Sequence, residues 1–280
     1  MLVTGINPIP TRLPRRLSDC HKGDFGAVGI LGGAPGMGGA ALLAGRAALA
    51  CGAGRVYLGM LDERIAIDPI TPELMIGTPD RMLDLPSPAC LVAGPGLGSS
   101  SAAREWLQSV LPLEHALLLD ADALNLIARD EAMLNPIRAR THPTLITPHP
   151  GEAARLLGES TASVQADRES AIDRLVQLTG ATVVLKGAGT LVKYPGGTVW
   201  RNATGNPGMA APGMGDVLSG IIAALLVQGM TAGQAAQTGV WLHGAAADAA
   251  VAAGTGPVGL MASELIAAAR RLLNEQLIST

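Results

Sequence analysis

A glycine-rich stretch over residues 202–220 holds the residue types best suited to phosphoryl transfer in this sequence. Gly213 and Gly215 have no side chains, so a ligand can come close to the backbone there. The apolar run 217–227 predicts a buried helix, whose unpaired first N–H groups and dipole favour an anion. Asp216 at that start is either a helix cap or a base beside a moving phosphoryl group, and its position alone leaves both interpretations open.

Two acids lie where another predicted strand ends. Residues 115–120 predict a strand that finishes at Asp120, and Asp122 follows shortly after it. Carboxylates at the carboxyl end of a strand face the ligand crevice of an open α/β sheet, but they also cap helices. Asp122 is therefore a candidate for contact with a ligand or a metal ion, with capping as the alternative.

His149 and Lys186 also follow predicted strands, over residues 144–147 and 182–185. The prolines on both sides of His149 fix the local backbone and hold the ring where the loop points. A binding histidine and a structural histidine are both compatible with this pattern. Lys186 is followed by Gly187, which suggests a phosphate contact, although a hairpin turn would need glycine as well.

Strand-like and helix-like segments alternate along the chain, which implies an α/β fold with a mainly parallel sheet covered on both faces. No repeat, linker or compositional break divides the sequence, so we predict one domain over residues 1–280, with an N-terminal arm at 1–20. The arginines of that arm, Arg12, Arg15 and Arg16, suggest a solvated surface or a subunit contact. Further strands are predicted at residues 27–31, 55–59, 91–98 (with a glycine turn) and 191–194, and further helices at 40–50, 152–157, 239–254 and 264–277.

The composition excludes several classes of function. With 48% hydrophobic and 15% charged residues, the chain is expected to fold around a sizeable core. Aromatic residues make up only 2% and the net charge is −3, so neither base stacking nor attraction to nucleic acid or an acidic membrane is expected. Cys20, Cys51 and Cys90 form no CxxC pair, which argues against zinc and disulfides and fits a reducing cytoplasm. We find no signal peptide and no apolar run of the roughly 18 residues that a membrane span needs.

A second glycine-rich loop, at residues 32–39, precedes the predicted helix 40–50. Gly36, Gly38 and Ala41 match the G-x-G-x-x-G/A spacing of dinucleotide-binding folds, which keeps a Rossmann oxidoreductase among the alternatives. The match is weak by itself because the chain contains 36 glycines. The motif G-x-x-x-x-G-K-[ST] does not occur in the sequence, which excludes a P-loop enzyme.

Taken together and in this order, the motifs resemble those of the ADP/ATP-dependent NAD(P)H-hydrate dehydratases, members of the ribokinase-like superfamily. The resemblance covers nearly the whole chain from His21 onward, and it implies a three-layer αβα domain with a mainly parallel central sheet. Met214 departs from the pattern, because many relatives carry a small hydroxyl residue between the two glycines. The motifs are HKGDFG at residues 21–26, GAALLA at 39–44, GPGL at 94–97, DADAL at 120–124, TPHPGE at 147–152, LKGAGT at 185–190 and the stretch 202–220.

The resemblance implies a repair reaction, in which the (S) form of NADH or NADPH hydrate is dehydrated to NAD(P)H. The hydroxyl of the hydrate would be phosphorylated by ADP or ATP, giving AMP or ADP, and phosphate would then be eliminated. Such an enzyme is a hydro-lyase that uses Mg²⁺. Single-domain members usually use ADP, and we see no epimerase domain in this sequence, so ADP is the expected co-substrate.

The resemblance also implies roles for individual residues. Asp216 is the base near the substrate hydroxyl and contacts the hydrate. Glu152, and with less support Asp122, would reach Mg²⁺ through water. The other implied contacts are Ala40, Gly96 and His149 with the hydrate; Lys186, Gly187, Ala188, Gly189, Thr190 and Gly215 with the adenine nucleotide; and Asn206, Gly213, Met214 and Gly215 with the transferred phosphoryl group.

The expected partners are the hydrate, an adenine nucleotide and a separate NAD(P)HX epimerase, in a cytoplasmic homotetramer that binds neither nucleic acid nor membrane. A ribokinase-like kinase is one alternative, and it would release a stable phosphorylated alcohol. A catalytically silent nucleotide-binding protein is another, although the intact Asp216 and its flanking glycines argue against it. A Rossmann oxidoreductase would leave the motifs of the C-terminal half without a chemical role.

Overall fold

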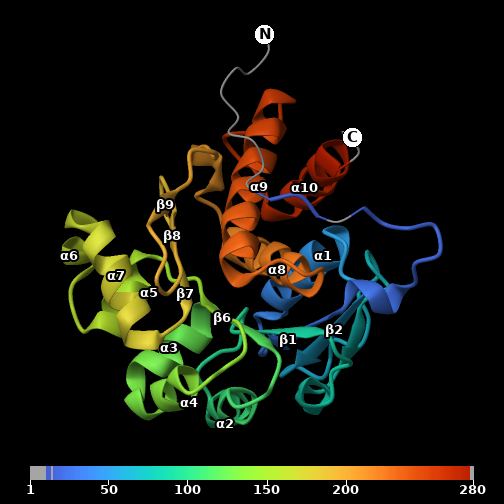
Figure 1. Ribbon diagram of the computed structural model, residues 1–280. Helices are drawn as coiled ribbons and strands as arrows, with labels where there is room; N and C mark the ends of the chain where they lie inside the picture. Colours follow the sequence, from blue (N-terminus) through green and yellow to red (C-terminus); the bar gives the residue numbers. More distant parts are fainter. Residues whose placement is uncertain (1–10, 14, 278–280) are drawn as a thin grey trace.

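The computed structural model describes residues 11–13 and 15–277, and in this part of the chain nine strands form one sheet (Figure 1). The strands are β1 (Ala27–Gly32), β2 (Arg55–Met60), β3 (Met75–Gly77), β4 (Ala89–Ala93), β5 (Ala116–Leu119), β6 (Thr144–Ile146), β7 (Thr182–Leu185), β8 (Leu191–Lys193) and β9 (Trp200–Arg201). Their order across the sheet is β3-β2-β1-β4-β5-β6-β7-β8-β9. The pairs from β3 to β7 are parallel, and only β7–β8 and β8–β9 are antiparallel.

The central strands align their carboxyl ends. Leu31 of β1 pairs with Ala93 of β4, Ala93 pairs with Leu119 of β5, and Leu119 pairs with Ile146 of β6. Strands β1 and β4 are buried over their whole length, which is why they read as apolar runs and not as alternating patterns. The loops that leave these strands therefore open at one edge of the sheet, where open α/β folds bind ligands.

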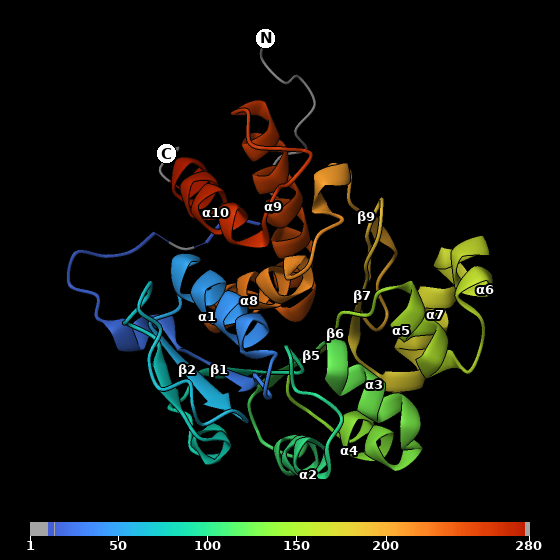
Figure 2. The same ribbon diagram turned by 180° about the vertical axis from the view of Figure 1, so that it is seen from behind.

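Helices cover both faces and make the sheet the middle of three layers (Figures 1 and 2). One face carries α1 (Gly38–Ala50), α8 (Met214–Val227), α9 (Ala232–Ala252) and α10 (Ala262–Leu277). The other carries α2 (Ser101–Val110), α3 (Ala121–Arg129), α4 (Leu134–Arg138), α5 (Pro150–Leu157), α6 (Thr161–Ala166) and α7 (Arg168–Thr179). Short 3-10 turns are η1 (Lys22–Phe25), η2 (Pro79–Leu83), η3 (Glu131–Met133) and η4 (Pro207–Met209). These layers confirm the predicted α/β class and the mainly parallel sheet.

The predicted helix at 239–254 starts too late. In the structure α9 begins at Ala232, after a capping box in which Thr231 and Gln234 exchange side-chain and backbone hydrogen bonds. That T-x-x-Q signal is present in the sequence. None of the helices in the described ranges is long and apolar enough to cross a membrane.

The N-terminal arm makes contacts within the chain. Residues 11–13 and 15–20 form no helix or strand, and the first ten residues of the predicted arm lie outside the described residues. The guanidinium of Arg16 stacks on the ring of Phe25 at 3.7 Å and donates to the carbonyl of Gly52 at 2.8 Å. Arg16 therefore anchors the arm to the domain, which the prediction of a solvated or subunit-facing cluster did not foresee.

Helix α8 packs closely against α1. Nearly every residue of α8 is buried, because the helix packs against β4 of the sheet and has α1 and α9 as neighbours. Gly220 allows this approach: a Cβ added there would lie only 2.1 Å from the carbonyl oxygen of Ala44 in α1. The pairing fixes α8, and with it the N-terminal turn that carries Asp216.

We expect Gly220→Ala to lower the free energy of unfolding by about 1–3 kcal/mol, because the added methyl group forces α1 and α8 apart. Chemical denaturation monitored by circular dichroism measures the change. Gly39→Ala is the matched control, since a Cβ there meets no atom within 4 Å and alanine favours a helix. Equal stability of the two variants would contradict the close-packing argument.

Candidate functional site

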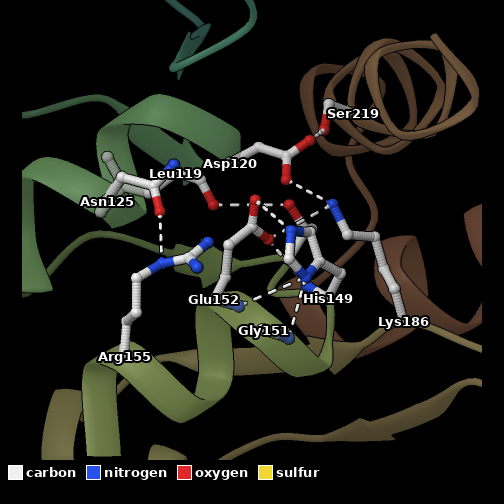
Figure 3. A network of polar contacts seen from close by, with 10 residues as sticks. Leu119, Asp120, Asn125, His149, Gly151, Glu152, Arg155, Lys186 and Ser219 are labelled. Atoms are coloured by element: carbon white, nitrogen blue, oxygen red, sulfur yellow. Dashed lines mark hydrogen bonds and ion pairs between the residues drawn. The ribbon is translucent and has the colours of Figure 1, made fainter. Parts of the chain in front are cut away.

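A buried polar cluster lies at the carboxyl ends of β5, β6 and β7 (Figure 3). Asp120 directly follows β5, Glu152 lies in the first turn of α5 behind β6, and Lys186 directly follows β7. Because these strands are adjacent and parallel, the three side chains meet at one edge of the sheet. Helix α8 brings Asp216 and Ser219 to the same place.

Asp120 joins the parts of the cluster. Its side chain is 1% exposed; one carboxylate oxygen accepts a hydrogen bond from Lys186 Nζ at 2.7 Å, and the other accepts one from Ser219 Oγ at 2.8 Å. The next residue, Ala121, has a φ of +49°, the only positive φ among the described residues other than glycine. Such strain is typical of functional sites, and here it lies at the turn from β5 into α3.

Lys186 places a positive charge beside the start of α8. Its Nζ lies 3.8 Å from Glu152 Oε2, and a Cβ on Gly215 would lie 3.2 Å from the same nitrogen. Burial opposes the charge, but Asp120 and Glu152 keep the pKa of Lys186 above its ordinary value. The ammonium therefore stays charged at neutral pH.

Asp216 lies in the first turn of α8, which begins after Gly213 at a φ of +85°. The N–H of Val217 donates to Gly213 O and makes the first hydrogen bond within this helix. The N–H groups before it have no such partner and are available to an anion. The Asp216 carboxylate forms no hydrogen bond or ion pair with the described residues, so the capping interpretation is not supported. Burial, and next the charge of Asp120, raise the pKa of Asp216 to about 7.

Glu152 and His149 form a capping box at the start of α5. The backbone N–H of His149 donates to Glu152 Oε2 at 2.7 Å, and His149 Nδ1 accepts from the N–H of Gly151 at 2.9 Å and of Glu152 at 3.3 Å. Glu152 is 4% exposed, and burial raises the pKa of its carboxyl group to about 7 against the opposing charge of Lys186. Both residues thus have structural roles in addition to any contact with a ligand.

The His149 ring is half-exposed, although both of its nitrogens face groups of the protein. Because Nδ1 accepts hydrogen bonds, the neutral ring carries its proton on Nε2, which lies 3.2 Å from Glu152 Oε1. The side chain is 48% exposed, and burial of the rest, with Lys186 nearby, lowers the pKa of the ring. At neutral pH His149 is therefore an uncharged donor at the rim of the cluster.

Two of the residues expected to contact the hydrate, Ala40 and Gly96, meet where the loop after β4 reaches the start of α1. A Cβ added to Gly96 would lie 3.2 Å from the Cβ of Ala40 and 2.4 Å from Met37 O, so only glycine fits there. Asp122 supports the loop that follows, since its carboxylate accepts from the N–H of Gly98 at 2.8 Å. This contact accounts for Asp122 without a metal ion.

Asn206 orders the loop that leads to α8. Its Oδ1 accepts from the N–H of Gly208 at 3.0 Å, and its Nδ2 donates to Asp248 Oδ1 at 2.9 Å. The other Asp248 oxygen accepts from the N–H of Gly205 at 2.8 Å, which ties the loop to α9. Both ends of the Asn206 amide are thus engaged within the protein.

Sequence reasoning left Ser219 and Asp248 without roles, and for Asp120 it offered only the general choice between facing the ligand crevice and capping a helix. The position of Asp120 at a strand end was a usable signal. Ser219 also had a usable signal, because in the helix predicted over residues 217–227 it lies one turn after Asp216 on the same face. Asp248 gave no signal, since its partners are more than 40 positions away in the chain.

The cluster does not form a complete metal site by itself. Among the described residues no group of three or more histidine, cysteine, aspartate or glutamate side chains could hold a metal ion. Glu152 already accepts from the backbone of His149 and faces Lys186, which disfavours direct binding of a divalent cation. A water-mediated contact from Glu152 to a Mg²⁺ ion held mainly by phosphates fits this donor set.

Comparison with known proteins gives a consistent result. A family model described as NAD(P)H-hydrate dehydratase matches residues 28–271. The chain is 43% identical, over 98% of its length and 93% of the relative, to the ADP-dependent (S)-NAD(P)H-hydrate dehydratase of Neisseria meningitidis serogroup B. It is 45% identical to the bifunctional NAD(P)H-hydrate repair enzyme of Escherichia coli, over 94% of the chain, and spans 50% of that longer protein.

A solved structure of a dehydratase also resembles this chain. The ADP/ATP-dependent NAD(P)H-hydrate dehydratase from Bacillus subtilis, co-crystallised with ATP and Mg²⁺, matches with a TM-score of 0.81 and 29% identity over 95% of both chains. The predicted ribokinase-like architecture is thereby confirmed.

We expect Asp120→Asn to lower the pKa of Asp216 clearly below about 7, because it removes the negative charge with the largest effect on that carboxylate and frees Lys186 to approach it. Carbon-13 NMR titration of the aspartate carboxyl groups measures the shift. Asp173→Asn, which removes a carboxylate paired with Lys193 elsewhere, should leave that pKa unchanged. An unshifted pKa in a folded Asp120→Asn protein would show that burial alone sets it.

Proposed function

This chain belongs to the NAD(P)H-hydrate dehydratase family, and on that premise we propose that it converts the (S) form of NADH or NADPH hydrate to NAD(P)H at the expense of an adenine nucleotide. The observation that carries the proposal is the juxtaposition of the unbonded Asp216 carboxylate, the free N–H groups of the first turn of α8 and the Lys186 ammonium. One base, one anion hole and one cation are what phosphoryl transfer to a hydroxyl group needs.

The chemistry divides a difficult elimination into two steps. Hydroxide is a poor leaving group, so the hydroxyl oxygen of the hydrate first attacks the terminal phosphorus of ADP or ATP while Asp216 accepts its proton. AMP or ADP leaves. The lone pair of the ring nitrogen then expels phosphate, and loss of a proton from the neighbouring ring carbon restores the double bond of NAD(P)H. The enzyme is a lyase in this scheme.

The chain positions the two ligands. The N–H groups at Gly213, Met214 and Gly215 would bind the transferred phosphoryl group, and Asn206 would support that loop. The loop 186–190 and Gly215 would bind the nucleotide. Ala40, Gly96 and His149 would line the hydrate site; Gly96 adjoins Ala40, and His149 lies beside Glu152.

Mg²⁺ would be held by the nucleotide phosphates, with Glu152 in contact through water, and would neutralise phosphate charge. Crystallisation of the Bacillus subtilis relative with ATP and Mg²⁺ supports this part of the proposal. The name of the Neisseria meningitidis relative favours ADP as the co-substrate.

We further propose that residues 1–280 act as a single dehydratase unit in the cytoplasm, beside a separate NAD(P)HX epimerase. The bifunctional name of the Escherichia coli relative supports the link to a second repair activity, and the free Cys51 and Cys90 fit a reducing compartment. A homotetramer is the proposed assembly. The exposed Val258 and Met261, beside an apolar groove of 450 Å³ that includes Leu43, offer a contact surface.

The decisive assay mixes the protein with NADH hydrate, Mg²⁺ and ADP or ATP, and follows the absorbance of reduced nicotinamide. We expect nucleotide-dependent recovery of NADH, a rate that rises with pH as Asp216 loses its proton near pH 7, and a loss of roughly 10²-fold or more in Asp216→Asn. Nucleotide consumption with a stable phosphorylated product would favour a kinase. Near-normal turnover in Asp216→Asn would remove Asp216 from its role as base.

His149 can be tested in two variants because it also caps α5. His149→Ala should raise the KM for the hydrate and lower the melting temperature, since it removes both the ring and the cap. His149→Asn should recover the melting temperature, because asparagine is a good cap, but not the KM. Recovery of both quantities in His149→Asn would leave His149 with a structural role alone.

A further inference from the structure

The loop between β7 and β8 leaves a row of N–H groups unused. The N–H groups of Gly187, Ala188 and Gly189 donate to no described residue, whereas the N–H of Lys186 donates to Pro148 O at 2.9 Å. Gly187 has a φ of +132° and Gly189 a φ of +62°, so both glycines hold conformations that other residues rarely adopt. Successive free N–H groups in such a turn form a concave site for an anion.

Arg168, the first residue of α7, forms hydrogen bonds with backbone carbonyl groups of the same loop. It donates from Nη1 to Ala188 O at 2.6 Å, and from Nη2 to Leu185 O at 3.0 Å and Lys186 O at 3.2 Å. The Thr190 hydroxyl donates to the remaining carbonyl, that of Gly187, at 2.9 Å. The carbonyl groups from 185 to 188 are therefore all engaged within the protein, whereas the three N–H groups of the same loop are not.

The positive charge of Arg168 has no carboxylate partner. No acidic side chain of the described ranges lies within 4.0 Å of it, and its Nε is buried without a hydrogen-bond partner. Burial lowers the pKa of the guanidinium, and the nearby Arg201 adds to the effect. Arg201 pairs with Glu169 at 3.0 Å, and its guanidinium would lie 3.3 Å from a Cβ on Gly189. The loop thus lies against two cations, one of them unneutralised.

We propose that Arg168 is a positioning residue for the nucleotide. By binding carbonyl groups of the loop, it fixes the backbone so that the N–H groups of Gly187, Ala188 and Gly189 bind the phosphates of ADP or ATP. The inference rests on the proposed function and extends it to α7, outside the motifs that carry the family resemblance. Lysine cannot replace this arginine, because a single ammonium on a flexible stem does not reproduce the planar fork that reaches three carbonyl oxygens.

Arg168→Lys keeps the charge and removes the fork. We expect the Kd for ADP, measured by titration calorimetry, to rise at least about tenfold through loss of the charge-assisted hydrogen bonds, while the KM for the hydrate changes less than about threefold. Hydrogen exchange of the segment 187–190 should become faster in the same variant, since its carbonyl groups are no longer held.

Arg140→Lys is the matched control. Arg140 also donates to three carbonyl groups, those of Leu111, Leu113 and His115, but at the amino ends of the strands, away from the loop. The Arg140→Lys variant should lose about as much stability as Arg168→Lys. Its affinity for ADP and the rate of hydrogen exchange in segment 187–190 should stay at the wild-type level.

Each outcome decides the proposal. Wild-type affinity for ADP in a folded Arg168→Lys protein would overturn it and leave the proposed function intact. An equal rise in the hydrate KM would also overturn it, because Arg168 would then act on the whole fold. If Arg168→Lys does not fold, Arg168→Gln is measured in the same way. A wild-type protein that binds neither ADP nor ATP would instead reject the proposed function, and this inference would fall with it.

Discussion

The buried ion pair between Lys186 and Asp120 is the constraint on which the rest of the site depends. The Asp120 side chain is 1% exposed and that of Lys186 is 18% exposed. Breaking a fully buried pair typically costs about 3–5 kcal/mol because one charge is left uncompensated, and that value is an upper bound here. The second oxygen of Asp120 binds Ser219, so the same carboxylate joins the end of β5 to the end of β7 and to α8. Three segments from distant parts of the sequence are thereby held in one arrangement.

This arrangement also sets the chemistry. Asp120 keeps Lys186 charged and raises the pKa of both Asp216 and Glu152, for which burial is the larger cause. Asp216 therefore changes its protonation state near neutral pH, which suits a group that must take a proton and give it up again. A reaction whose leaving groups are phosphates needs little covalent chemistry from a protein, so fixed charges and free N–H groups can supply most of the catalysis.

Close backbone approaches make the arrangement possible. Gly220 lets α8 touch α1, Gly96 lets the loop after β4 reach the start of the same helix, and Gly94 lies so near Asp120 that an added Cβ would be 1.8 Å from its carbonyl oxygen. Apart from the hydrate contact proposed for Gly96, these glycines take no direct part in the reaction. They matter because a side chain at any of them would displace the elements that position Asp216, Ala40 or Asp120.

The sequence by itself determined the α/β class, most strands and helices, and the family, because apolar runs, glycine turns and short motifs are local signals. It also marked Asp216, Lys186 and His149 as candidates from their places after strands or at a helix start. Only the tertiary structure decided that Asp216 is not a cap, that His149 caps α5 and that Asn206 is bound to Asp248. It alone connected Asp120 with Ser219 and Arg168 with the loop 186–190. These pairings link residues up to 99 positions apart, and the burial that shifts the pKa of Asp216 exists only once the sheet and its helices have closed around it.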